Sequence, residues 1–184
     1  PMMLCSGGGG RTDYGALRYF TEFWPSDNTD PLERIFIQWG YSHFFPLKSM
    51  CAHVTNWNRS TSIKFRTDVA MMCKLGFDII VKDLPDDELQ FCRQELRNYN
   101  RLKHTILDGD FYRLVSPYEG QHAAMQTVSA DRTGSVVFAY DLNPRYGEQL
   151  PAVRLTGLDP DLRYRIREIN LMPGQNPRIE HNDR

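Results

Sequence analysis

The sequence has 184 residues, of which 41% are apolar and 24% charged, and its formal net charge at pH 7 is −1. This composition is typical of a globular protein and excludes a collagen-like or fully disordered chain. A net charge so close to zero argues against binding to nucleic acid or to an anionic membrane through bulk charge.

The N-terminal stretch PMMLCSGGGG predicts a short strand followed by a loop. It lacks the charged and apolar regions of a signal peptide, and no run of 18 apolar residues predicts a transmembrane helix. The compartment stays open between cytoplasm and periplasm. Because the chain starts within a strand, we expect it to be part of a longer protein.

The next residues, up to about Gly109, alternate short apolar runs with helical patterns. Residues 13–24 have near-helical spacing, and residues 31–42 predict a helix whose cap is Asp30. Residues 49–56 predict a buried strand, and residues 65–80 a helix or turn followed by a second strand. The clearest helix is predicted over residues 84–107, with an apolar stripe that runs through Leu89, Cys92, Leu96, Tyr99 and Leu102.

The pattern changes to antiparallel sheet after residue 110. Two β-rich runs flank ADRTG, which predicts a hairpin over residues 123–143. A second hairpin is predicted over residues 152–170, with its turn at DPD. The C-terminal half therefore predicts an antiparallel sandwich, whereas the first half predicts an α/β unit.

The four consecutive glycines, Gly7–Gly10, predict a site where backbone approaches a ligand. Phosphate loops are excluded because no lysine and hydroxyl residue follow the glycine spacing. The polar turn FWPSDNTD offers a second feature. Asp30 is explained as a helix cap, but Asp27 is not, and a carboxylate beside Trp24 suits acid/base work on a sugar if partial burial raises its pKa.

The segments CSGGGGRTDYG, FWPSDNTD, ERIFIQWG, MCAHVTN and FRTDVAMMCKLGFD together resemble the α-galactosidases of glycoside hydrolase family 36. The resemblance is continuous over residues 3–80 and looser to the end of the chain. It implies the C-terminal half of a (β/α)8 barrel in residues 1–109, whose fifth to eighth strands lie near residues 1–5, 20–24, 49–54 and 77–80. It implies an antiparallel β-sandwich domain, held only in part, in residues 110–184.

The resemblance also implies roles for four residues, carried over position by position. Asp27 is the general acid/base. Cys5 lies at the substrate, Gly7 leaves room for the galactose C2 substituent, and Trp24 shapes the wall of the site. His53 and His43 are expected to be structural.

A second carboxylate is missing, since the segment that carries the nucleophile in this family has no counterpart in the chain. Retaining glycosidases need two carboxylates about 5–5.5 Å apart. The chain alone is therefore expected to be inactive, as part of a retaining α-galactosidase acting on melibiose- or raffinose-type sugars. Alternatives are a non-catalytic carbohydrate-binding or interaction module, or a piece of an α-N-acetylgalactosaminidase or galactosyltransferase.

The expected partner is an α-galactoside, with neither nucleic acid nor membrane, and the chain is expected to form homo-oligomers. No cofactor and no metal is predicted. The four cysteines lack the C-x-x-C spacing of zinc and redox sites, which favours free thiols: Cys5, Cys51, Cys73 and Cys92.

Overall fold

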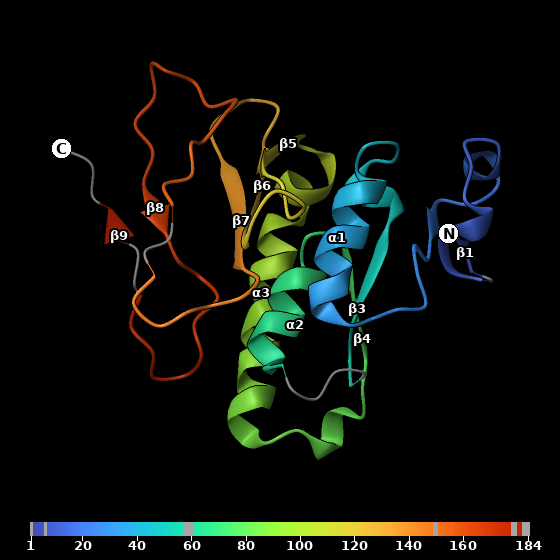
Figure 1. Cartoon of the computed structure of the whole chain (residues 1–184), viewed down its shortest axis with the longest axis horizontal. Coiled ribbons are helices and arrows are strands. Elements are labelled where there is room, and N and C mark those ends of the chain that lie inside the picture. Colours follow the sequence, from blue (N-terminus) through green and yellow to red (C-terminus); the bar gives the residue numbers. More distant parts are fainter. Residues whose placement is uncertain (1, 6, 57–60, 149–150, 178–179, 182–184) are drawn as a thin grey trace.

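Parallel strands form the N-terminal part of the fold, in chain order (Figure 1). The computed structural model describes residues 2–5, 7–56, 61–148, 151–177 and 180–181. Strand β1 (Met3–Leu4) pairs with β2 (Glu22–Phe23), and β3 (Cys51–Thr55) pairs with β4 (Lys74–Asp78), all in parallel. A parallel bridge between Phe23 and Met50 joins the two pairs. The carboxyl ends of all four strands therefore meet along one edge.

Helices follow the second, third and fourth strands: α1 (Pro31–Tyr41), α2 (Ile63–Ala70) and α3 (Asp86–Asp108). Short 3-10 turns lie at Gly8–Arg11, Ala16–Arg18, Leu47–Ser49 and Val81–Asp83. The predicted cap of α1 is confirmed, because the Asp30 carboxylate accepts hydrogen bonds from the backbone N–H groups of Leu32 and Glu33. The helical spacing of residues 13–24 gives only the 3-10 turn, because Glu22 and Phe23 pair with β1.

The long helix α3 lies between the parallel strands and the C-terminal sheet (Figure 1). Its predicted apolar stripe is wrong at Leu96, which is 44% exposed. The helix packs against α2 on one side and the C-terminal sheet on another, so its buried face is centred elsewhere. The buried residues are Phe91, Cys92, Glu95, Tyr99 and Ile106.

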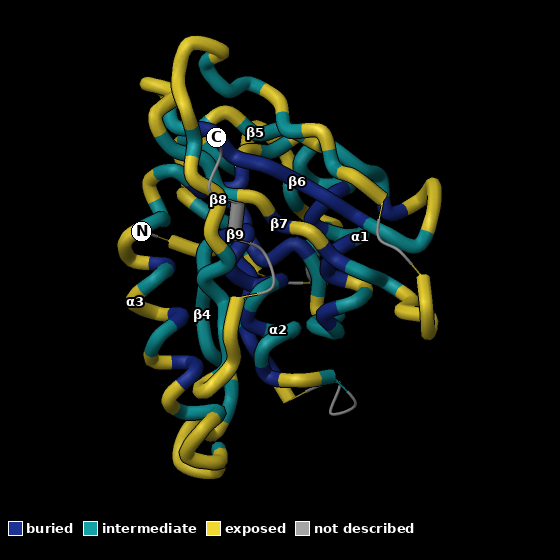
Figure 2. Tube along the Cα trace, turned by 90° about the vertical axis from the view of Figure 1, so that its left-hand side faces the viewer, coloured by how far each residue is buried: buried dark blue, intermediate teal, exposed yellow. Residues whose placement is uncertain are grey.

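The C-terminal half contains a three-stranded antiparallel sheet in the order β5 (Asp110–Val115), β6 (His122–Val128) and β7 (Ser135–Asp141). The predicted hairpin at ADRTG is confirmed as the β6–β7 connection, where Arg132 adopts a positive φ of 57°. Figure 2 shows that β6 is buried, apart from its first residue, His122. The sheet therefore buries its central strand against α3.

The predicted second hairpin is wrong. Strand β8 (Ile166–Arg167) pairs instead with β9 (Glu180–His181), and the segment around DPD is irregular. A side chain closes this turn, because the Tyr164 hydroxyl accepts a hydrogen bond from the Asp159 N–H and donates to the Arg132 carbonyl. Tyr164 thus links the turn to the β6–β7 hairpin and is not part of a strand.

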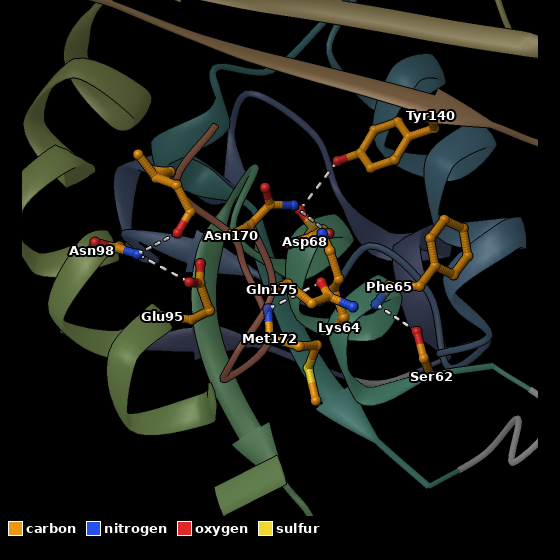
Figure 3. A network of polar contacts seen from close by, with 11 residues as sticks. Ser62, Lys64, Phe65, Asp68, Glu95, Asn98, Tyr140, Asn170, Met172 and Gln175 are labelled. Atoms are coloured by element: carbon orange, nitrogen blue, oxygen red, sulfur yellow. Dashed lines mark hydrogen bonds and ion pairs between the residues drawn. The ribbon is translucent and has the colours of Figure 1, made fainter. Parts of the chain in front are cut away.

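The C-terminal segment is attached to α2 through Asp68 (Figure 3). The Asn170 amide donates a hydrogen bond of 2.7 Å to the Asp68 carboxylate, which also pairs with Lys64 at 2.7 Å. The Tyr140 hydroxyl of β7 donates to the Asp68 backbone carbonyl at 3.1 Å. Asp68 therefore connects the C-terminal sheet, and the C-terminal tail that contains Asn170, to the first half of the chain.

A second attachment runs through Asn98 of α3 (Figure 3). Its amide donates to the Glu95 carboxylate at 2.9 Å and to the Ile169 carbonyl at 3.2 Å. Glu95 is fully buried, and its Oε2 has no hydrogen-bond partner among the described residues. Burial raises the pKa of Glu95 to about 7, and the charge of Asp68 acts in the same direction.

Candidate functional site

The predicted site residues Cys5 and Trp24 lie at the carboxyl ends of neighbouring strands. Cys5 directly follows β1 and is exposed, while Trp24 directly follows β2 and is buried. The Trp24 N–H donates a hydrogen bond of 2.9 Å to the Leu4 carbonyl, so the parallel pairing extends to these two residues. The two strands therefore bring Cys5 and Trp24 to one edge of the sheet.

Glycine suits two positions of the run after β1 for different structural reasons. Gly7 has a φ of 67°, and a Cβ atom added there would have no neighbour within 4 Å. A Cβ on Gly9 would overlap the Tyr41 hydroxyl and lie 2.5 Å from the Pro25 carbonyl oxygen. Gly7 leaves open space beside the strand end, and Gly9 packs the glycine loop against the loop that carries Asp27.

Asp27 lies in the loop between β2 and α1, and its side chain is exposed. The loop is held by local hydrogen bonds. The Asn28 N–H donates to the Ser26 hydroxyl at 3.1 Å, and the Asp30 N–H donates to the Asn28 side chain at 3.0 Å. The partial burial expected for Asp27 is wrong within this chain, where the side chain is exposed.

Two side chains pack on the Trp24 ring at the start of this loop. The Arg34 guanidinium of α1 lies 4.5 Å from the centroid of the Trp24 ring. The His53 ring of β3 lies 4.6 Å from the same ring, centroid to centroid, at an angle of 52°. The Trp24 ring is therefore in contact with both a cation and an imidazole.

The His53 ring occupies the space that a side chain would need at the neighbouring position on β4. It lies opposite Gly76 in the parallel register, and a Cβ on Gly76 would overlap the imidazole ring. Burial lowers the pKa of His53, and the Arg34 charge acts in the same direction. A neutral imidazole packed on Trp24 fits the structural role expected for His53 from the sequence, which stays a prediction.

The carboxyl end of β3 is tied to the Asp27 loop. The Thr55 hydroxyl donates to the Thr29 hydroxyl at 2.9 Å. Arg66 of α2 donates to the Thr55 carbonyl at 2.6 Å and to the Asn56 side chain at 2.9 Å. A small hollow, partly open to solvent, lies here and is lined by Thr29, Pro31, Arg34, Gln38, Ala52, His53, Arg66, Val69 and Ala70.

Sequence reasoning missed Arg34, although a signal was present. Arg34 follows Pro31 by three residues and precedes Gln38 by four, so a charged side chain lies on the face that α1 buries. Arg34 is 3% exposed. A charge on the buried face of a helix is the pattern that could have identified it.

Among the described residues, no helix is long and apolar enough to cross a membrane. No cluster of three or more histidine, cysteine, aspartate or glutamate side chains there could hold a metal ion. All four cysteines are free thiols, and only Cys5 is exposed.

Comparison with known proteins gives two family matches. Residues 2–109 match the family model described as Melibiase, and residues 122–181 match the glycosyl hydrolase family 36 C-terminal domain. The chain is 38% identical over 175 residues to α-galactosidase AgaA of Geobacillus stearothermophilus, covering 92% of this chain and 24% of AgaA. It is 36% identical over 165 residues to the bifunctional α-galactosidase/sucrose kinase AgaSK of Mediterraneibacter gnavus, covering 87% and 18%.

Solved structures agree with these matches. The crystal structure of the family 36 α-galactosidase AgaA superposes with a TM-score of 0.82 at 39% identity, over 85% of this chain and 23% of AgaA. The galactosidase domain of AgaSK superposes with a TM-score of 0.85 at 32% identity, over 98% and 27%. The chain thus spans about a quarter of the length of AgaA. Variants of AgaA have been crystallised in complex with raffinose and with stachyose.

Proposed function

The chain belongs to the melibiase family, the α-galactosidases of glycoside hydrolase family 36, and we propose that it supplies the acid/base side of a retaining α-galactosidase site. The observation that carries this proposal is the meeting of Cys5, Trp24 and the Asp27 loop at the carboxyl ends of β1 and β2. Active sites lie at the carboxyl ends of the strands in (β/α)8 barrels. The four parallel strands are proposed to be the fifth to eighth strands of such a barrel, with the domain boundary between residues 109 and 110.

Asp27 acts first as an acid and then as a base in the proposed reaction. It protonates the glycosidic oxygen as the bond to the leaving sugar breaks, and it later takes a proton from the water that releases galactose. Its exposed position in the loop suits both steps, because both the leaving sugar and water must reach it. The nucleophile is a carboxylate from outside this sequence, about 5–5.5 Å from Asp27 in the assembled site.

The other three residues bind the galactosyl group in this proposal. Cys5 contacts the sugar from the end of β1, and Trp24 forms part of the wall beneath it. Gly7 leaves the space for the C2 hydroxyl, which agrees with the open surroundings of its missing Cβ. The raffinose and stachyose complexes of AgaA support terminal α-galactosyl residues of such oligosaccharides as the substrate class.

The test compares the full-length gene product that contains this chain with the 184-residue chain alone. We expect the full-length protein to release galactose from raffinose and nitrophenol from a nitrophenyl α-galactoside. We expect no turnover of either compound by the chain alone, because an acid/base without a nucleophile cannot form the glycosyl intermediate. Galactoside binding by the full-length protein without any turnover would contradict the proposal and favour a binding module.

A further inference from the structure

Arg34 is a buried cation in helix α1. It is 3% exposed, and Nε, Nη1 and Nη2 all lack a partner among the described residues. A buried charge without a partner destabilises a protein, and replacing such charges by apolar side chains is often neutral or stabilising. A residue that costs stability in this way is expected to serve another purpose.

One carboxylate stands out among the groups that act on this charge. Burial lowers the pKa of Arg34, and the groups that oppose this effect are Cys73, Cys51, Asp27 and Tyr41. Burial raises the pKa of both thiols and of the tyrosine, so these three groups are neutral near pH 7. Asp27 is therefore the one carboxylate in this set, and its charge acts on the Arg34 guanidinium.

The Asp27 loop is fixed at both ends by contacts near Arg34. At its start, the Arg34 guanidinium lies over the Trp24 ring, which also contacts His53. At its end, Asp30 caps the first turn of the helix that carries Arg34. Only a few residues separate these two points, so the orientation of Trp24 constrains the position of Asp27.

We propose that Arg34 is a positioning residue that holds the Trp24 ring in place. Both this ring and the charge of Arg34 orient the Asp27 carboxylate. The inference rests on the proposed function of Asp27. Arg34 itself touches no reacting atom in this account. Its contribution is a fixed geometry, and displacing a catalytic group by about 1 Å can cost 100-fold in rate.

The first experiment uses the 184-residue chain and does not depend on activity. Arg34→Met keeps the length of the side chain and removes the charge, and Arg97→Met is the matched control on an exposed arginine of α3. We expect the tryptophan bands of the near-ultraviolet circular dichroism spectrum to change in Arg34→Met and not in Arg97→Met. We expect the denaturant midpoint of Arg34→Met to equal or exceed that of the unmodified chain. An unchanged spectrum, or a lower midpoint, would overturn the proposal.

The second experiment measures turnover of raffinose by the full-length gene product. In Arg34→Met, kcat is expected to fall by about 10- to 100-fold while KM changes by less than about threefold. Arg34→Lys restores the charge over the ring and is expected to recover at least about half of that loss on a logarithmic scale. An unchanged kcat in Arg34→Met refutes the positioning role of Arg34 and leaves the proposed function intact. Absence of turnover in the unmodified protein refutes the proposed function, and the spectrum then still decides the role of Arg34.

Discussion

Glu95 makes the stability of the chain depend on pH, and Glu95→Gln tests this dependence. The side chain is fully buried between α2, α3 and the C-terminal tail, where it faces Asn98, Asp68, Lys64 and Arg101. Burial raises its pKa from an ordinary 4.5 to about 7 in the folded chain. The unfolded chain therefore loses this proton near pH 4.5, whereas the folded chain keeps it up to about pH 7.

The sign and the size of the effect follow from these two values. Because the folded state binds the proton more tightly, the free energy of unfolding falls as the pH rises from about 4.5 to about 7 and stays low above that. Each pH unit in this interval is worth about 1.4 kcal/mol, so Glu95 costs about 3 kcal/mol at pH 8. The amide side chain introduced by Glu95→Gln stays neutral at every pH, and its oxygen can still accept the hydrogen bond that the Asn98 amide donates.

The assay is denaturant unfolding of the 184-residue chain at pH 4.5, 6 and 8. Glu95→Gln is expected to match the unmodified chain at pH 4.5 and to exceed its free energy of unfolding by up to about 3 kcal/mol at pH 8. Glu119→Gln, on an exposed glutamate, is the control and should show no such trend. A Glu95→Gln chain that is less stable than the unmodified chain at pH 8 would refute the reasoning.

Three further predictions concern the N-terminal part. A thiol reagent should inactivate the full-length protein through the exposed Cys5, since burial raises the pKa of the Cys51, Cys73 and Cys92 thiols to about 11, 12 and 11; galactose should slow this inactivation, and equal rates with and without galactose would remove Cys5 from the site. Gly9→Ala should lower the free energy of unfolding by about 1–3 kcal/mol, because its Cβ meets Tyr41 and the Pro25 carbonyl; Gly10→Ala, which meets nothing within 4 Å, is the control, and equal stability of the two variants would argue against the close packing of the loops. Light scattering of the isolated chain should give a mass above 21.4 kDa, because Met2, Met3 and Tyr19 are exposed near the edge of β1, and a monomer would contradict this.

Local patterns in the sequence predict much of this fold correctly. The cap at Asp30, the buried strand β3 and the hairpin at ADRTG all follow from the residues at those positions. They succeed because a cap, a buried strand and a tight turn each depend on a few adjacent residues. The prediction of β8 fails for the opposite reason, since its partner β9 is set by distant contacts.

The site is predicted from sequence only in part. The motif residues Cys5, Trp24 and Asp27 could be named because a family resemblance carries them, and their roles remain predictions. The helical position of Arg34 could have indicated its burial, but its contact with Trp24 could not be derived from its neighbours in sequence, because it depends on how α1 packs against the end of β2. The exposure of Asp27 likewise depends on how the loop of residues 24–30 folds, which local propensity does not determine.

The role of Asp27 is tested most directly by the leaving-group dependence of Asp27→Asn in the full-length protein. We expect turnover of raffinose to fall by about three orders of magnitude or more, because its leaving group needs protonation. Glycosyl transfer from a nitrophenyl α-galactoside should be affected much less, and azide should restore the second step by replacing the activated water. Raffinose turnover close to that of the unmodified protein would show that Asp27 is not the acid/base and would contradict the account of this site.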